Sequence, residues 1–206
     1  MRSRILVTIL GLLLVVPAPT CLGKMAQGKK KKHPPATQEQ KLADRIAKIR
    51  THLSEARDGD PAVTALTGQG RNYAGKAEQQ LAGGQLFAAD RLAGAADALA
   101  RVADHLAHAR DESRPQPPRL DELARRLEKT YFRVQQADYF LAQSKDAKAK
   151  VLVRYARRFY QQARQSYDRK EARQADEFAK AADEVVKALE HLAQAATPVP
   201  VPPLLR

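Results

Sequence analysis

Residues 89–109 read ADRLAGAADALARVADHLAHA, and residues 175–195, which lie 86 positions further along, read ADEFAKAADEVVKALEHLAQA. Ten of the 21 aligned positions are identical, and six of these ten are alanine, which is common throughout the chain. The remaining matches carry the weight of the comparison: Asp90/Asp176, Asp97/Asp183, His105/His191 and Leu106/Leu192. An internal repeat of this kind indicates that one helical unit is used twice.

Around the two copies, apolar residues recur three and four positions apart, which is the period of a helix with one buried face. Local sequence divides this pattern into helices. Thr37 begins a capping box, Asp60-Pro61 is typical of a helix start, and Gly83-Gly84 is typical of a helix end. Ser144 is a further candidate cap. Aromatic residues make up only 5% of the chain and tryptophan is absent, so the core must consist mainly of alanine, leucine and valine.

These patterns predict an all-α fold with two units of three helices, over residues 37–113 and 119–196. Three prolines in the segment 114–118 exclude a continuous helix and indicate a linker. We expect the duplicated units to form a six-helix bundle or a short helical-repeat array. In the fourth helix, the stripe expected to be buried is Leu120, Leu123, Leu127, Tyr131, Val134 and Leu141.

Small and aromatic residues recur in corresponding parts of the two units. The first set is Tyr73, Ala77, Leu81, Gly84, Leu86 and Ala89; the second is Phe159, Ala163, Tyr167, Ala175, Ala179 and Ala182. Over about 25 residues in each unit, this pattern resembles the crossing positions of tetratricopeptide helical hairpins. The resemblance implies binding of a peptide or protein on a concave helical face.

The N-terminal residues 1–23 have the organisation of a secretory signal peptide. Arg2 and Arg4 precede a short apolar run that is too short to span a membrane, and small residues follow it. We expect cleavage after Gly23 and a periplasmic or secreted protein. An uncleaved anchor, or a lipoprotein modified at Cys21, are the alternatives.

Positive charge is concentrated in two places of a chain whose formal net charge is +13. The first is the segment 24–36, which contains a run of lysines and is expected to be a disordered basic tail. The second lies between residues 145 and 173, which hold ten Lys and Arg against three acids. There, helical spacing places five cations on the side opposite the apolar stripe: Lys150, Arg154, Arg157, Arg158 and Arg164. The C-terminal segment 197–206 is expected to be an extended Pro-rich tail.

The sequence contains no recognisable catalytic constellation. His105 and His108 share one helical face, but a zinc site needs at least a third ligand, which would have to come from across the unit interface. We therefore expect structural histidines, no bound metal, no cofactor and no enzymatic activity. The repeated aspartates are expected to pair with Arg or Lys of a neighbouring helix or to face water.

The sequence thus favours an exported, non-enzymatic helical protein of the cell envelope. Its expected role is to bind a protein partner or an anionic surface, such as lipid headgroups or cell-wall polymer, with the five cations between Lys150 and Arg164 making the contact. The alternative is a nucleic-acid-binding protein that uses the basic face of residues 145–173, which export would disfavour. Apolar helical stripes are also compatible with a homo-oligomer.

Overall fold

A computed structural model describes residues 37–56, 59–111, 119–142 and 147–196. Several expectations fall outside these ranges. They are the signal peptide at 1–23, the basic tail at 24–36, the linker at 114–118, the cap at Ser144 and the Pro-rich tail at 197–206.

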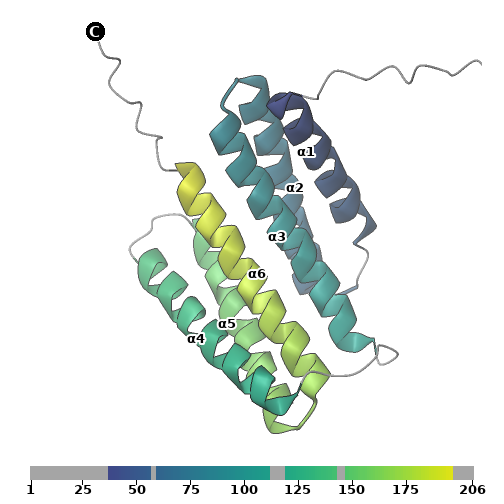
Figure 1. Cartoon of the computed structure of the whole chain (residues 1–206), viewed down its shortest axis with the longest axis vertical. Helices are drawn as coiled ribbons and strands as arrows, with labels where there is room; N and C mark the ends of the chain where they lie inside the picture. The colour runs from purple at the N-terminus through teal and green to yellow at the C-terminus, as the bar shows by residue number, and fades with distance from the viewer. Residues whose placement is uncertain (1–36, 57–58, 112–118, 143–146, 197–206) are drawn as a thin grey trace, which may run out of the picture. The chain divides into compact units, whose positions relative to one another are not determined.

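The predicted all-α fold is confirmed. The described residues form six helices that pack as a bundle (Figure 1), and no strand occurs among them. The helices are α1 (Gln38–Glu55), α2 (Pro61–Ala82), α3 (Leu86–Arg110), α4 (Leu120–Ala142), α5 (Ala147–Asp168) and α6 (Ala172–Ala196). None of these six helices is long and apolar enough to cross a membrane.

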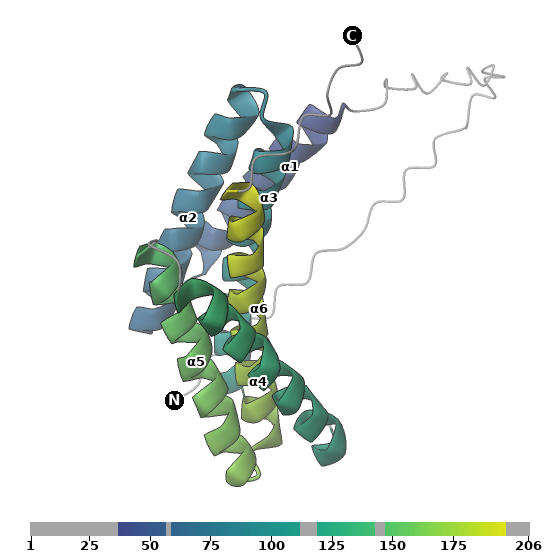
Figure 2. The same cartoon turned by 90° about the vertical axis from the view of Figure 1, so that its left-hand side faces the viewer.

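The centre of the bundle is the antiparallel pair α3 and α6, which lie side by side along most of their lengths (Figures 1 and 2). Helix α2 packs on α3, and α5 packs on α6, while α1 and α4 occupy the outer positions of their respective halves. One hydrophobic cluster includes buried residues from all six helices, and a smaller one joins α4 to α5 and α6 around Leu123 and Leu127.

Small residues allow the central helices to approach closely. Eight alanines of α3 and five of α6 are buried. At Gly94 of α3, an added Cβ would lie only 2.9 Å from the ring of His191 of α6. Because each buried alanine removes little apolar area from water, stability must accumulate along long helices of 22 to 25 residues such as α2, α3, α5 and α6.

The predicted helix starts at Thr37 and Asp60 are confirmed. The Thr37 hydroxyl accepts a hydrogen bond from the Gln40 amide, and the Gln40 side chain accepts one from the Thr37 amide, so the capping box is complete. The Asp60 carboxylate accepts from the Ala62 amide at 2.7 Å, with Pro61 at the first helical position. These contacts explain why both boundaries can be recognised from local sequence.

The repeated aspartates pair with basic residues of neighbouring helices, which was one of the two expected outcomes. Arg45 of α1 donates to Asp90 of α3 at 2.7 Å, and Arg126 of α4 pairs with Asp176 of α6. The second aspartate of each copy is also paired: Asp183 with Arg133 of α4, and Asp97 with Arg101 of its own helix and, at 3.9 Å, with Arg45 of α1. In both halves of the bundle, the pairs with Arg45, Arg126 and Arg133 join the outer helix to the central one.

Two residues of the buried stripe expected in α4 are instead exposed. Leu120 is 51% exposed and Tyr131 is 43% exposed, whereas Leu123, Leu127 and Val134 are buried as expected. The side chain of Leu141 lies outside the described part of the chain. Leu120 is the first residue of its helix. Tyr131 lies at the edge of the buried stripe, where its ring packs beside Tyr160 of α5 at a centroid distance of 5.6 Å. The prediction assigned both residues to the core because it included every apolar residue that follows the previous one by three or four positions.

Candidate functional site

Helix α5 separates its apolar and cationic residues onto different sides. Its buried side comprises Ala149, Leu152, Val153, Ala156, Phe159, Ala163 and Ser166. The helix also carries six Lys and Arg residues, and its single acid is Asp168 at the C-terminal end. An amphipathic helix of this composition buries its apolar side against the bundle and presents its charges to solvent.

All five cations of the predicted site are exposed, and the helix brings them to one side. We call this set the α5 cationic face; it consists of Lys150, Arg154, Arg157, Arg158 and Arg164. Arg157 forms an ion pair with Asp138 of α4. Within the described part of the chain, the other four have no carboxylate within ion-pair distance.

Helix α4 lies beside α5 (Figures 1 and 2) and exposes aromatic side chains that the sequence did not assign to a site. Phe132 is 60% exposed, Tyr139 is 67% exposed, and Tyr131 is the partly exposed ring that packs beside Tyr160. Four of the five exposed large hydrophobic residues found in the described ranges belong to this helix. We call Tyr131, Phe132 and Tyr139 the α4 aromatic residues. Of these three, only Tyr131 was assigned to the buried stripe, whereas Phe132 and Tyr139 lie off that stripe and received no role in the sequence analysis.

The contact between α4 and α5 lies beside both sets. Tyr131 packs edge-on against Phe132 at 5.7 Å between centroids, and its other neighbour is Tyr160 of α5. Burial raises the pKa of the Tyr160 hydroxyl, and the nearby positive charge of Arg164 opposes this effect. Tyr160 is therefore neutral at physiological pH, and the surface at this junction combines neutral aromatic groups with arginine.

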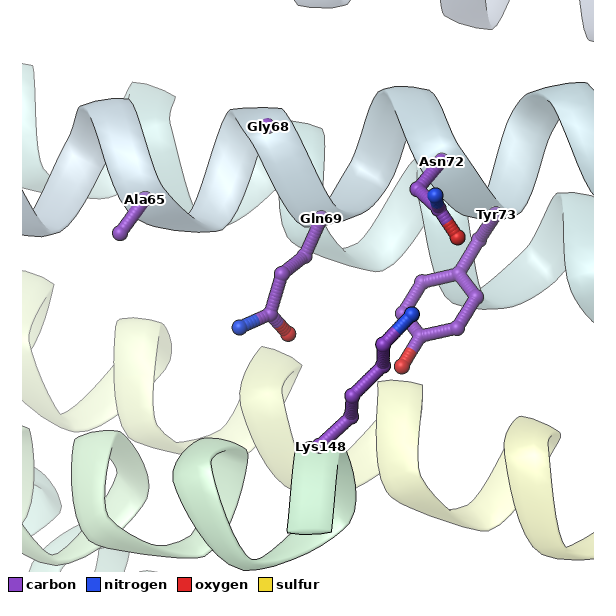
Figure 3. Close-up of a pocket in the computed structure, with 6 residues that line it drawn as sticks. All are labelled: Ala65, Gly68, Gln69, Asn72, Tyr73 and Lys148. Carbon is purple, nitrogen blue, oxygen red and sulfur yellow. The ribbon is translucent and has the colours of Figure 1, made fainter. Parts of the chain in front are cut away.

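A second feature of α5 lies towards α2. Lys148 extends across to Tyr73 at one end of an open pocket (Figure 3), and the other lining residues are Ala65, Gly68, Gln69 and Asn72 of α2. These six residues include no carboxylate, imidazole or thiol. The ionisable side chains in this lining are those of Lys148 and Tyr73.

Comparison with known proteins gives no assignment: no family model, no curated protein and no solved structure matches the chain.

Proposed function

We propose that this protein is an exported, non-enzymatic component of the cell envelope that binds an anionic surface through α4 and α5. The observation that carries the proposal is that the exposed α5 cationic face and the exposed α4 aromatic residues lie on two adjacent helices. The expected export rests on the signal-like sequence of residues 1–23.

This combination suits the boundary between an anionic lipid layer and water. The planar guanidinium of arginine matches phosphate and carboxylate groups through paired hydrogen bonds. Tyrosine is enriched at the headgroup region, where its ring is withdrawn from water while its hydroxyl stays hydrated, and the phenylalanine ring adds apolar surface. A face with arginines alone would suit any polyanion, whereas adjacent exposed rings favour a surface that also accepts apolar groups.

The expected affinity for an anionic membrane follows from the number of cations on the α5 cationic face. Each Lys or Arg close to an anionic membrane contributes about 1 kcal/mol of binding free energy at physiological ionic strength. The four cations of the α5 face without a carboxylate partner therefore contribute about 4 kcal/mol, which corresponds to an association constant of roughly 10³ relative to an uncharged face. The lysine run at residues 29–32 can add to the attraction.

The proposal is tested by co-sedimentation of the protein lacking residues 1–23 with vesicles of phosphatidylglycerol and phosphatidylethanolamine. The test variant carries R154E, R157E, R158E and R164E, and we expect it to lose at least 100-fold in vesicle affinity. The matched control reverses four exposed cations of α1 and α2, namely Lys41, Lys48, Arg71 and Lys76, and so has the same net charge. Because Arg157 pairs with Asp138, a further variant with only R154E and R158E leaves that ion pair intact.

Equal losses in the test and control variants would mean that binding depends on net charge alone, which contradicts a site on α5. Unchanged binding of the test variant, with its helical circular dichroism retained, would also exclude the proposal. Tight binding to duplex DNA combined with no binding to vesicles would favour the nucleic-acid alternative.

A further inference from the structure

The side chains of His105, His108 and Glu177 form a cluster between the two central helices. His105 and His108 lie one turn apart on α3, with ring centroids 6.5 Å apart, and Glu177 reaches them from α6. The Nδ1 atom of His105 is 2.7 Å from Oε2 of Glu177, and Nδ1 of His108 is 3.9 Å from the same oxygen. One potential ligand atom from each residue lies within 4.8 Å of the other two.

We infer that His105, His108 and Glu177 form a binding site for a divalent transition metal ion, with zinc as the best match. Two imidazoles and one carboxylate are a donor set that Zn²⁺ accepts, leaving a fourth position for water. Nitrogen donors disfavour Ca²⁺ and Mg²⁺, which prefer oxygen ligands. Since the inference concerns the α3–α6 interface, it is independent of the anionic-surface function proposed for α4 and α5.

The two distances from Glu177 to the histidines require only small side-chain adjustments, and the two imidazoles, whose ligand atoms lie within 4.8 Å of each other, must also move closer together. Metal–ligand bonds of about 2.0–2.1 Å at tetrahedral angles place neighbouring ligand atoms about 3.3 Å apart. The His105–Glu177 distance of 2.7 Å must lengthen and the His108–Glu177 distance of 3.9 Å must shorten, each by roughly 0.6 Å. The Glu177 side chain is 10% exposed, and those of His105 and His108 are 21% and 30% exposed, so the site is sheltered but open to water.

The charged neighbours of Glu177 leave one carboxylate oxygen available. Lys180 donates to Oε1 of Glu177 and also contacts Asp176, both at 2.8 Å. Oε2 therefore faces the two histidines. The positive charge of Lys180 opposes a cation, whereas the carboxylate of Asp176 offsets part of that repulsion, so we expect a dissociation constant in the micromolar range.

The chain itself supplies a control site at the other end of the α3–α6 pair. Residues 86 positions away from His105, His108 and Glu177 are His191, Gln194 and Arg91. Arg91 of α3 donates to the Gln194 side chain of α6 at 3.1 Å. This contact corresponds to the one between Glu177 and His108, with the two helices exchanged. There a guanidinium replaces the carboxylate and an amide replaces one imidazole, so this second arrangement cannot bind a metal ion.

The test is isothermal titration of the untagged protein lacking residues 1–23 with ZnCl₂, with metal content after desalting as a second readout. We expect about one bound zinc per chain at a micromolar dissociation constant. Variants H108Q and E177Q should each weaken binding at least tenfold. The matched control H191Q, at the equivalent position of the second arrangement, should bind zinc like the unchanged protein.

Titration with Co²⁺ gives a check on the ligands, because absorption in the visible range reports coordination number and geometry. The unchanged protein and H191Q should develop the strong bands of four- or five-coordinate cobalt, while H108Q should not. Absence of saturable zinc binding in the unchanged protein would overturn the inference. So would equal binding by E177Q, or loss of binding in H191Q comparable to the loss in H108Q.

Discussion

Substituting Gly70 by alanine tests the close approach of α1, α2 and α3. Gly70 lies in the middle of α2 and is buried. A Cβ at this position would lie 2.8 Å from Cδ2 and 3.3 Å from Cδ1 of Leu53, and 3.5 Å from Cβ of Leu99. Leu53 is 0% exposed, so its side chain has no solvent-filled space into which it can move. The new methyl group must therefore displace the helices or force Leu53 out of a favourable rotamer.

The same helix contains two glycines that serve as controls. No atom lies within 4 Å of a Cβ added at Gly68 or at Gly75. Alanine is favoured over glycine inside a helix by about 1 kcal/mol, so G68A and G75A should each stabilise the protein by about that amount. In G70A the same gain is opposed by overpacking, which typically costs 1–3 kcal/mol. We therefore expect G70A to be about 2 kcal/mol less stable than G75A.

Thermal denaturation followed by circular dichroism measures this difference. For a protein of this size, 1 kcal/mol corresponds to about 2–4 °C in Tm, so G70A should melt about 4–8 °C below G75A. The variant L53V should restore part of the lost stability in the G70A background, since it removes volume at the point of contact. An increase in Tm for G70A equal to that of G75A would show that the packing of α1 on α2 described here is wrong.

Two further predictions concern the polar contacts of the central helices. The pKa of the Glu177 carboxyl is lowered from 4.5 to about 2: burial opposes ionisation, but the hydrogen bonds from His105 and Lys180 outweigh it. Because the folded-state pKa is below the unfolded value, this stabilisation is present above pH 4.5 and is lost as pH falls towards 2. After allowance for screening by water, we expect it to contribute about 2 kcal/mol to the free energy of unfolding. The free energy of unfolding should therefore fall between pH 5 and pH 2, and it should fall less in E177Q. In the second prediction, R133A removes a guanidinium whose side chain is 19% exposed and which pairs with Asp183 and with Glu190 at 2.8 Å, whereas R119A removes one that is 80% exposed. Urea denaturation should show a loss of about 2 kcal/mol for R133A and less than about 0.5 kcal/mol for R119A, and equal effects would argue against the α4–α6 pairing.

The parts of the fold that depend on neighbouring residues in sequence could be predicted. The cap at Thr37 and the start at Asp60-Pro61 follow from hydrogen bonds within four residues, and helical periodicity sufficed to place the five cations on one side of α5. For the repeated aspartates, the sequence left two environments open, an ion pair with a neighbouring helix or exposure to water, because either one can satisfy the hydrogen bonds of a carboxylate.

The remaining features depend on which helices meet and in which direction. Glu177 joins His105 and His108 only because α3 and α6 are antiparallel, whereas the internal repeat associated His105 with His191, which instead lies against Gly94. Phe132 and Tyr139 lie off the apolar stripe predicted for α4, so periodicity pointed them away from the core. It could not say whether another helix covers that side of α4, and the structure leaves both residues exposed.

The most direct test of the central claim, that α4 and α5 together bind an anionic surface, is the vesicle affinity of a variant that keeps every charge and loses two rings. Variant F132S/Y139S changes only exposed side chains, so it should retain the helical circular dichroism of the unchanged protein. Moving about 100 Å² of apolar ring surface out of water contributes roughly 2–3 kcal/mol, and partial burial at the headgroup level gives about half of that for each ring. We predict at least a tenfold loss of affinity for vesicles containing phosphatidylglycerol, and the variant R154E/R158E should lose affinity for the same vesicles. Affinity equal to that of the unchanged protein would contradict the claim, because binding would then not involve the exposed rings of α4.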